Sequence, residues 1–452
     1  MTQLLNFSAS LHHQFDHKKI LILGWGREGQ STFQTLGQCC PAAQLFVSDQ
    51  DQSSIQQWLA ENHSKLEIAP YLQDLDTFDV IFKTPGIPVR LPALQSYLSQ
   101  GKQLTSQLNE FLRIFRDQVT GVTGTKGKST TSSLMRHLLQ TVGKEVVLAG
   151  NIGLPVFEIA SAITPQTEVV IEMSSYQLET VEVSPHRAIL LNFFPEHLNY
   201  HQSLANYLAA KAQITLFQTA DDFLIFNQDS TEIQSIAKNS VAQKIPFSYQ
   251  QNLLYSPLVT EVLSRQEELK LPAVVTKRNL LPALLATEQV QHSATEVIQH
   301  LATFQTLAHR LEVVGQYQGI TWIDDTLATI PEATIVALET LPRVDVILLG
   351  GYDRGISFEK IVEACLKKKV PAIGFFKPSG QIMYDLLHAQ YPRHQWPIMK
   401  VVEDMKDAVA FGYAAAPAGG TVLLSPSSPS FGQFKDYQDK SAQFRDWILR
   451  LA

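Results

Sequence analysis

One short stretch of the chain has the residue types and the spacing needed to bind a polyphosphate. Between residues 119 and 139 a strand-like segment, a loop bounded by Gly124 and Gly127, and a helical stretch follow one another. Glycines let successive backbone N–H groups point at one anion, the helix N-terminus adds its positive end, and Lys128 supplies a cation. The Ser129 hydroxyl follows, where a magnesium ion on the phosphates needs an oxygen ligand. The stretch predicts Mg-ATP or Mg-GTP binding.

The loop differs from the common phosphate-loop pattern at one position. That pattern has a glycine five residues before Gly127, and Val122 stands there, with glycines at 121 and 124 instead. We interpret the stretch as a variant loop. The alternative, a glycine turn that happens to precede Lys-Ser, is less favoured because a strand comes before it and a helix after it.

Other strand ends carry groups that bind magnesium. One strand ends at Glu172, and in phosphate-loop folds a neighbouring strand often presents an acid to the metal. The next strand leads to His197, a candidate metal ligand, although a single histidine is more often structural. The helix expected at 203–217 places Lys211 in an apolar run. From the residues alone, Lys211 is better explained as a surface lysine that extends its ammonium group to water.

The composition limits the classes of protein to consider. With 452 residues the chain is too long for one core and suggests about three domains. It is 45% hydrophobic and 17% charged with a net charge of −7, which favours a globular protein that binds small molecules and argues against nucleic acid. Without a signal-like start or an apolar run of membrane-spanning length, we expect a cytoplasmic protein with no membrane contact. The cysteines lack metal-ligand spacing and are expected to be buried apolar residues: Cys39, Cys40 and Cys365.

The N-terminal part opens with a second strand, glycine loop and helix. Gly24, Gly26 and Gly29 stand between the strand and the helix, which matches the dinucleotide fingerprint. Asp49 ends the next strand, twenty residues past Gly29, where an acid meets a ribose hydroxyl. A further strand ends in a turn that contains Gly86, at the same edge of the sheet. NAD or FAD fits this pattern, a nucleotide sugar fits equally well, and an ordinary strand-to-helix turn is the structural alternative.

Strands and helices alternate along the rest of the chain. This alternation is typical of α/β folds with mostly parallel sheets. We expect three domains: a Rossmann-like substrate-binding domain at 1–115, a central phosphate-loop ATPase domain at 116–306, and a C-terminal Rossmann-like domain at 307–452.

Taken in chain order, these motifs resemble those of the Mur ligases. The matching segments extend over nearly the whole chain and are 121–130, 151–153, 172–177, 196–198, Lys211 and His309-Arg310. The loop at 24–29 makes the chain most similar to the branch that adds glutamate to UDP-N-acetylmuramoyl-L-alanine. The resemblance implies a monomeric ATP-dependent amide ligase of peptidoglycan precursor synthesis, with ATP, magnesium, glutamate and UDP-N-acetylmuramoyl-L-alanine as cofactors and partners.

The resemblance also implies roles for individual residues. The first domain then binds the UDP part of the substrate instead of a redox cofactor, through Gly26, Arg27, Asp49, Gly86, Asn151 and Ser174. The implied ATP contacts are Gly124, Thr125, Lys126, Gly127, Lys128, Ser129, Thr130, Asn279, Arg310 and Asp325. The implied magnesium ligands are Ser129, Glu172, His197 and Lys211 as a carbamate, and the implied catalytic residues are Lys128, Glu172, His197 and Lys211. The implied amino-acid contacts are Arg354, Ser425 and Phe431.

Several positions depart from the family pattern. Leu327 stands where the family usually has a phosphate-facing lysine, and Arg354 stands where many D-glutamate members have a lysine. The segments 125–128, 193–197 and 429–432 are also unusual for that branch. These variants favour a subfamily that adds L-glutamate, with D-glutamate as the alternative. Arginine holds a carboxylate as a fork and lysine holds it as a point charge, so the exchange at 354 can reorient the amino acid.

The distribution of charge indicates how such a ligation would proceed. A carboxylate that attacks the γ-phosphate of ATP needs cations to neutralise both partners, so magnesium, Lys128 and the loop N–H groups are expected to stabilise formation of an acyl phosphate. The glutamate amine then displaces phosphate while water is excluded. Two other functions stay open. An NAD-dependent dehydrogenase leaves Lys128 and Glu172 without a role, and a non-catalytic ATP-binding protein is compatible with Leu327.

Overall fold

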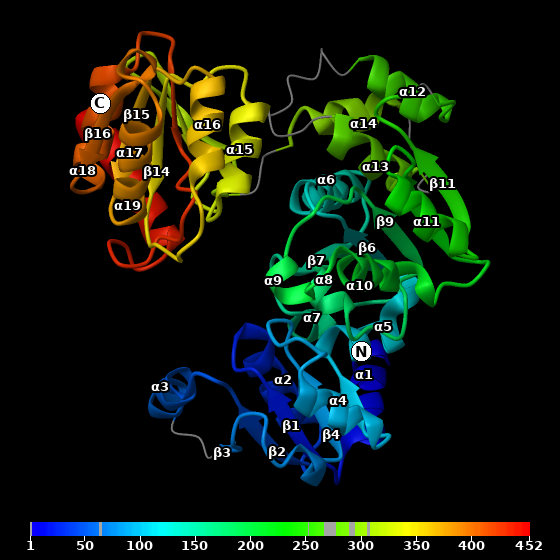
Figure 1. Cartoon of the computed structure of the whole chain (residues 1–452). Helices are drawn as coiled ribbons and strands as arrows, with labels where there is room; N and C mark the ends of the chain where they lie inside the picture. The colour runs from blue at the N-terminus through cyan, green and yellow to red at the C-terminus, as the bar shows by residue number, and fades with distance from the viewer. Residues whose placement is uncertain (1, 63–65, 252, 266–276, 289–293, 305–307) are drawn as a thin grey trace. The chain divides into compact units, whose positions relative to one another are not determined.

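The computed structural model describes residues 2–62, 66–251, 253–265, 277–288, 294–304 and 308–452. These residues form two compact units, one ending at Phe304 and the other consisting of residues 308–452. The first unit contains two sheets and the second contains one, each with helices packed around it (Figure 1). The expected α/β class with three sheets in sequence is therefore confirmed. The expected boundary at 115/116 falls inside the first unit, and both domain boundaries stay predictions.

The first sheet has five parallel strands in the order β3-β2-β1-β4-β5. Its strands are β1 (Lys19–Leu23), β2 (Gln44–Ser48), β3 (Glu67–Ile68), β4 (Val80–Lys83) and β5 (Gln103–Thr105). The accompanying helices are α1 (Thr2–Phe15), α2 (Arg27–Cys39), α3 (Gln52–Asn62), η1 (Leu75–Thr77), α4 (Pro92–Ser99), α5 (Gln107–Phe115) and η2 (Arg116–Gln118). The central strands are apolar and almost fully buried, as expected where helices cover both faces of a parallel sheet.

The turn from β1 into α2 is too tight for any residue except glycine at position 29. A β-carbon on Gly29 would lie 2.0 Å from the Gly24 carbonyl oxygen. Gly26, by contrast, caps α2 with φ −72° and ψ −170°, and a β-carbon there would meet no atom within 4 Å. Close packing therefore requires the third glycine of the fingerprint, whereas the second leaves open space.

The second sheet has six parallel strands in the order β11-β10-β9-β6-β8-β7. Its strands are β6 (Val119–Thr123), β7 (Val146–Gly150), β8 (Glu168–Glu172), β9 (Arg187–Leu190), β10 (Phe223–Asn227) and β11 (Gln243–Phe247). The helices are α6 (Lys128–Thr141), α7 (Val156–Ile159), η3 (Ala160–Ala162), α8 (Ser175–Leu178), α9 (Leu198–His201), α10 (Leu204–Leu216), α11 (Thr231–Asn239), α12 (Pro257–Ser264), α13 (Lys277–Thr287) and α14 (Ala294–Leu301).

One hydrophobic core runs from the first sheet to the second. Phe7 on α1 packs on Phe115 of α5, with ring centroids 5.8 Å apart, and on Phe157 of α7, at 5.3 Å. Each such aromatic side chain stabilises the fold by about 1.5–3 kcal/mol through its burial. The shared core fixes the two sheets relative to each other, so loops from both can contribute to one site.

The third sheet, in the second unit, has the order β12-β13-β17-β14-β15-β16. Only the edge pair β12 and β13 is antiparallel. The strands are β12 (Glu312–Tyr317), β13 (Ile320–Asp324), β14 (Val346–Gly350), β15 (Ala372–Phe376), β16 (Ile398–Val402) and β17 (Thr421–Leu424). The helices are α15 (Pro331–Thr340), α16 (Glu359–Lys367), α17 (Ser379–Gln390), η5 (Arg393–Gln395), α18 (Met405–Ala415) and α19 (Tyr437–Leu451).

Two neighbouring buried carboxylates at the end of β13 have opposite pKa shifts. Burial raises the pKa of Asp325 to about 7, although a hydrogen bond from the Ser425 hydroxyl and the charge of Arg310 favour its ionised form. Burial acts in the same direction on Asp324, but hydrogen bonds from Ser441 and His309 outweigh it and lower the pKa of that carboxyl. The sheet end thus holds one acid that is ionised and one that titrates near neutrality.

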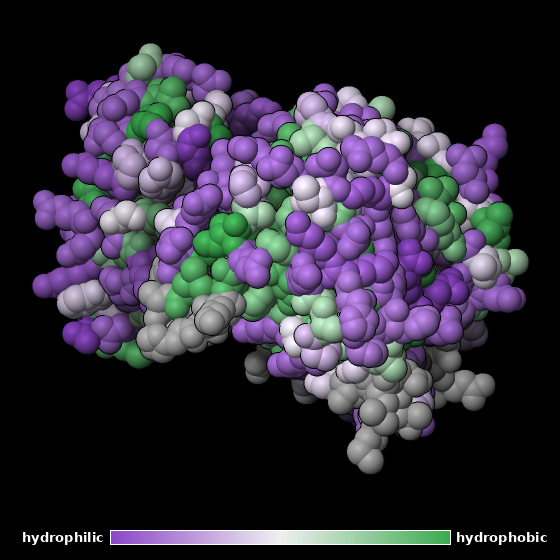
Figure 2. Space-filling model, turned by 90° about the horizontal axis from the view of Figure 1, so that it is seen from below, coloured by the Kyte–Doolittle hydropathy of each residue, from purple (hydrophilic) through white to green (hydrophobic). Residues whose placement is uncertain are grey.

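The surface is mixed in character. Figure 2 shows hydrophilic residues over most of the visible face, with hydrophobic residues in small groups among them. Within the described part of the chain, no helix is both long enough and apolar enough to cross a membrane. All three cysteines are free thiols, and Cys40 and Cys365 are buried as expected, whereas Cys39 is only half-buried.

The glycine turn gives a matched pair of stability variants. We expect Gly29→Ala to lower the free energy of unfolding by about 2 kcal/mol or more, because the new β-carbon overlaps the Gly24 carbonyl. Gly26→Ala should change it by less than about 0.5 kcal/mol, because its β-carbon has open space. Denaturant unfolding of both full-length variants checks this. Equal effects of the two alanines would contradict the tight packing at position 29.

Asp325 gives a prediction about pH. Its folded pKa, about 7, is above the unfolded value of about 3.9, so the folded state is favoured by protonation and loses stability as the pH rises from about 4 to 7. Asp325→Asn removes that loss. We expect the variant to match the wild type near pH 4 and to exceed it by on the order of 2 kcal/mol above pH 7.

Hydrogen exchange of amides in the second unit, measured across this pH range, reports the effect locally. Asp324→Asn is the control, because a lowered pKa has the opposite sign: the ionised carboxylate stabilises the folded state above the unfolded pKa, and this stabilisation disappears as the pH falls. An Asp325→Asn variant whose stability relative to the wild type is independent of pH would show that Asp325 titrates as an exposed acid.

Candidate active site

The predicted phosphate loop connects β6 to α6. Gly127 caps the helix with φ +84°, a conformation that glycine adopts without strain, and its carbonyl begins the helical hydrogen bonds. The Lys128 ammonium group folds back over the loop and donates to the carbonyls of Gly124 (3.0 Å) and Thr125 (3.1 Å). The Ser129 side chain lies in the first helical turn and is buried. This arrangement has the cation, hydroxyl and helix N-terminus that a polyphosphate requires.

The segment after β9 fixes the shape of the loop. Asn192 accepts from the Lys126 amide through Oδ1 and donates to the Lys126 carbonyl through Nδ2, both at 2.8 Å. The Lys126 ammonium group forms an ion pair with Glu196. No pattern in the sequence indicates the role of Asn192, because its partner lies 66 residues away. The loop is therefore held in a defined conformation before any ligand binds.

Lys211 corrects the interpretation made from the residues alone. It lies on α10, its side chain is only 2% exposed, and its Nζ donates to the Gly124 carbonyl at 2.8 Å, above the Tyr207 ring. The surface-lysine interpretation is wrong, because this face of α10 packs against the phosphate loop. Burial, and then the neighbouring Lys128 ammonium group, hold the pKa of Lys211 well below its usual range. The lowered pKa favours the neutral amine, which is the form that can react with carbon dioxide.

Glu172 has an unused oxygen atom in a buried position. The residue ends β8 and is 1% exposed. Its Oε1 accepts from the Asn151 side chain at 2.7 Å, whereas its Oε2 has no hydrogen-bond partner among the described residues. A buried carboxylate oxygen without a donor is costly unless a cation binds it.

His197 stands at the start of α9 in the left-handed conformation, with φ +58°. Its Nε2 lies 3.5 Å from Glu196, and its ring contacts those of Tyr176 and Tyr207 at 5.0 and 5.8 Å. Burial lowers the pKa of His197 despite the nearby Glu196 carboxylate. The neutral imidazole keeps a lone pair, which a metal ligand needs.

The donor set fits a magnesium ion. The unpartnered oxygen of Glu172, the Ser129 hydroxyl and a carbamate on Lys211 would be the oxygen ligands that Mg²⁺ prefers, with His197 beside them. Carbamylation would replace a buried cation with an anion and so remove the repulsion between Lys211 and Lys128.

The predicted substrate contacts of the first sheet lie at its carboxyl edge. Asp49 accepts from the Trp25 amide at 2.6 Å and so braces the glycine loop. The Arg27 side chain donates to the Gly153 carbonyl at 2.8 Å, which connects this loop to the second sheet. Gly26 and Gly86 are exposed, so a ligand can approach both.

A second contact joins the same loop to the central part of the chain. The side chain of Glu28 accepts from Gln177 at 2.6 Å. Gln177 and Ser174 form a reciprocal capping box at the start of α8, which fixes Ser174 beside the end of β8. Asn151 is exposed after β7 and contacts Glu172. The predicted substrate residues of the two sheets are thus connected by hydrogen bonds.

Asn279, the predicted adenine contact, lies against the phosphate loop. It is buried on α13, and its Nδ2 donates to the Gly127 carbonyl at 3.3 Å and to the Thr131 hydroxyl at 3.4 Å. Helix α13 packs on α6 here (Figure 1). Thr130 on α6 is also buried. Whether Asn279 contacts adenine stays a prediction.

In the second unit, the predicted contacts fall into two groups. Asp325 accepts from the Ser425 hydroxyl at 2.6 Å, and Arg310 acts on the same carboxylate electrostatically. The Nε of Arg310 has no hydrogen-bond partner among the described residues. Arg354 and Phe431 are exposed on two loops joined by a hydrogen bond from the Tyr352 amide to the Pro429 carbonyl, at 2.7 Å. These loops can present both side chains to one ligand.

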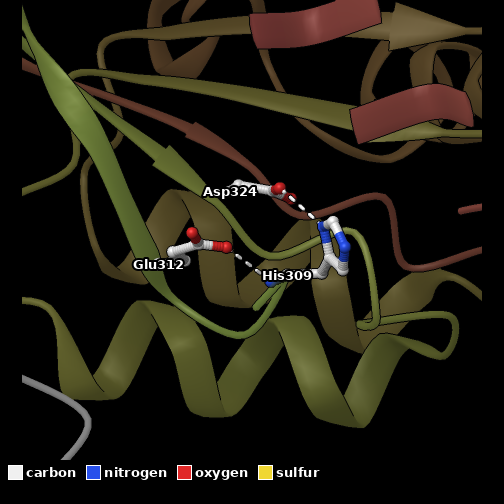
Figure 3. Close-up of side chains that lie close together, drawn as sticks. All are labelled: His309, Glu312 and Asp324. Carbon is white, nitrogen blue, oxygen red and sulfur yellow. Dashed lines mark hydrogen bonds and ion pairs between the residues drawn. The ribbon is translucent and has the colours of Figure 1, made fainter. Parts of the chain in front are cut away.

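His309, Glu312 and Asp324 form the one metal-like group of histidine and acidic side chains within the described ranges (Figure 3). The backbone amide of His309 donates to the Glu312 carboxylate at 2.8 Å. The Nδ1 atom of its ring is hydrogen-bonded to the Asp324 carboxylate at 3.0 Å. Arg445 donates to both carboxylates, at 2.6 and 3.0 Å. The guanidinium group already supplies the positive charge, so we interpret this group as an ion-pair network that holds His309 and not as a metal site.

Two parts of the chain match families of known proteins. Residues 122–277 match the Mur ligase middle domain, and residues 309–428 match the Mur ligase glutamate ligase domain. Proteins named UDP-N-acetylmuramoylalanine–D-glutamate ligase are similar over most of their length. That of Alkaliphilus metalliredigens is 30% identical over 97% of this chain and 99% of its own. That of Symbiobacterium thermophilum is 31% identical over 84% of this chain and 86% of its own.

Solved structures share the fold. The UDP-N-acetylmuramate–alanine ligase of Thermotoga maritima superposes with a TM-score of 0.57 at 16% identity, covering 96% of this chain and all of its own. The MurF ligase of the same organism, solved with ADP, gives a TM-score of 0.55 at 14% identity, with 98% and 97% covered. The sequence similarity to the D-glutamate ligases extends almost from end to end. It sets aside the dehydrogenase interpretation of the loop at 24–29. The chain belongs to the Mur ligases, a family of ATP-dependent amide ligases.

Proposed function

We propose that this protein joins glutamate to UDP-N-acetylmuramoyl-L-alanine at the cost of ATP, in the synthesis of peptidoglycan precursors for the cell wall. One observation carries the proposal. Lys128 and Lys211 donate to the same Gly124 carbonyl, next to a loop and helix N-terminus that match a polyphosphate, while Glu172 keeps a buried oxygen unpaired. Such a site gains stability when an anion and a divalent cation bind together.

The phosphate loop would bind the ATP phosphates. On binding, the Lys128 ammonium group would turn from the Gly124 and Thr125 carbonyls to the β- and γ-phosphates. The two hydrogen bonds between Asn192 and Lys126 use the Lys126 N–H, hold the loop in one conformation and so pre-arrange its remaining N–H groups. Pre-arranged donors cost little reorganisation during the reaction, which is the main source of electrostatic catalysis.

Magnesium would be held by Ser129, Glu172, His197 and carbamylated Lys211. When bound, it neutralises the phosphate charge that otherwise repels an attacking carboxylate. Burial lowers the pKa of both His197 and Lys211, which favours the neutral forms that this role requires.

The reaction would pass through an acyl phosphate. The alanyl carboxylate of the substrate attacks the γ-phosphorus, the bond to the β–γ bridging oxygen breaks, and ADP leaves. The neutral amine of glutamate then attacks the acyl carbon, loses a proton, and phosphate leaves as the amide forms. Because water would hydrolyse the acyl phosphate, this chemistry needs a site from which water is excluded.

We propose L-glutamate as the incoming amino acid. Arg354, exposed on the loop beside residues 425–432, would hold a carboxylate of glutamate in a fork, and Leu327 leaves out the positive charge that a lysine would add. D-glutamate is the second candidate, supported by the names of the relatives.

Phosphate release with the two glutamate enantiomers tests the proposal. With ATP, Mg²⁺ and UDP-N-acetylmuramoyl-L-alanine, we expect kcat/KM for L-glutamate to exceed that for D-glutamate by at least about tenfold, or about 1.4 kcal/mol. Arg354→Lys should lower this ratio, because the fork becomes a point charge. A preference for D-glutamate would favour the second candidate. Absence of release with both enantiomers would contradict the ligase itself.

Lys211→Ala tests the carbamate. We expect turnover to fall at least about 100-fold, or about 2.7 kcal/mol, because the metal site loses an anion. Acetate or formate at millimolar concentration should restore part of the activity by supplying carboxylate oxygens. Unfolding of the variant is the control, since removing a buried lysine also changes packing. Full activity without an added acid, or a loss that no carboxylic acid relieves, would contradict a carbamate role.

A further inference from the structure

A cluster of charged and polar side chains joins the turn after β4 to the turn that carries His197. Its centre is Glu179, which directly follows α8 and has a side chain 11% exposed. The Glu179 carboxylate pairs with Arg90, accepts from the Val89 amide at 3.2 Å, and accepts from the Tyr200 hydroxyl at 3.0 Å. Val89 and Arg90 lie in the turn after β4, and Tyr200 lies on α9. A single carboxylate therefore connects this turn to α9.

Tyr200 connects this carboxylate to both turns. Burial, and then the Glu179 charge, raise the pKa of Tyr200, so the phenol keeps its proton and acts as a donor. Its hydroxyl also lies within 2.9 Å of the Pro85 carbonyl and 3.1 Å of the Ile87 carbonyl. The Arg90 guanidinium donates to the Tyr200 carbonyl and lies over its ring. Arg90 therefore holds both ends of the Tyr200 residue.

Movement of Tyr200 would move His197. Helix α9 is one turn long, and the amides of Tyr200 and His201 both donate to the His197 carbonyl, at 3.1 and 2.9 Å. The Tyr176 ring packs between them, 5.0 Å from the His197 ring and 4.2 Å from the Tyr200 ring. Figure 1 shows α8 and α9 side by side. The position of the His197 ring thus depends on where Tyr200 is anchored.

The other side of the cluster belongs to the substrate edge of the first sheet. The turn after β4 contains Gly86, and the buried ammonium group of Lys83 braces it by donating to the Thr84 carbonyl (3.1 Å) and the Ile87 carbonyl (2.7 Å). Gly86 itself is exposed. A ligand that contacts this turn would act on a rigid element that is bonded directly to Glu179 and Tyr200.

We propose that Glu179 is a positioning residue that fixes His197 relative to the turn 84–90, so that a uridine-nucleotide ligand at this turn tightens binding of the metal–nucleotide complex. This inference rests on the proposed function, which gives Gly86 to the substrate and His197 to the metal. The coupling is reciprocal, since two ligands that favour one arrangement of the cluster assist each other equally.

The test measures the coupling between binding of the UDP compound and binding of the metal–nucleotide complex, and does not measure activity. Dissociation constants of Mn²⁺, followed by electron paramagnetic resonance, are compared with a non-hydrolysable ATP analogue present, with and without UDP-N-acetylmuramoyl-L-alanine. In the full-length wild type we expect the UDP compound to tighten Mn²⁺ binding about tenfold. In Glu179→Gln, which keeps the size and an acceptor oxygen but loses the charge that Arg90 requires, we expect less than about a twofold effect.

Glu182→Gln is the matched control. Glu182 lies three residues further along and pairs with Arg113 of α5, at 2.6 Å, so the control variant loses a more exposed arginine–glutamate pair at a different place. We expect the control to keep the tenfold coupling. Arg90→Gln should lose it, and the double variant with Glu179→Gln should lose no more than either single variant, because the two residues act as a unit. Thermal unfolding of each variant shows whether the fold is retained.

The outcomes separate the two proposals. Coupling that persists in Glu179→Gln, or coupling below twofold in the wild type when both ligands bind, would overturn this inference and leave the proposed function standing. A wild type that binds neither the UDP compound nor Mn²⁺ with the ATP analogue would overturn the proposed function, and the inference with it.

Discussion

The carbonyl oxygen of Gly124 accepts from two lysine ammonium groups, those of Lys128 and Lys211. Two cations on one acceptor repel each other, and burial also disfavours the charge of Lys211. The repulsion between the two ammonium groups is relieved when a polyphosphate attracts Lys128 or when Lys211 loses its charge. The elements around it serve to hold this arrangement: β6 and α6 form the loop, β8 presents Glu172, the segment after β9 clamps Lys126, and α10 carries Lys211.

The first sheet matters to this site because it shares a hydrophobic core with the second. A continuous core through Phe7, Phe115 and Phe157 joins the two sheets. Polar contacts then fix how the two sheets are aligned. Glu28 with Gln177 and Arg90 with Glu179 connect loops at the carboxyl edges of the two sheets. Hydrophobic burial is not directional, whereas charged hydrogen bonds fix register. The combination lets a ligand on one sheet act on residues of the other.

The second unit uses charge in a different way. Arg445 satisfies Glu312 and Asp324, so His309 is held by a completed ion-pair network instead of an open metal site. Asp325, one residue further, has the charge of Arg310 nearby, but burial outweighs it and raises the pKa of that carboxyl to about 7. Lys440, which the sequence did not single out, donates to the Gly350 carbonyl from a fully buried position and so braces the start of the loop that bears Arg354.

The sequence alone was enough to predict the features that depend on near neighbours in the chain. The strand, loop and helix units at Gly24–Gly29 and Gly124–Gly127, the parallel α/β class and the acid at the end of β8 follow from local periodicity and turn chemistry. It could not place Lys211, because an apolar helix does not reveal which face will be buried, and the partner carbonyl is 87 residues away. The role of Glu179 was equally hidden, since its charge is matched by Arg90, 89 residues earlier, and its neighbours in sequence give no signal. Both points needed the folded chain, because long-range pairing of charges depends on how the sheets pack and not on local spacing.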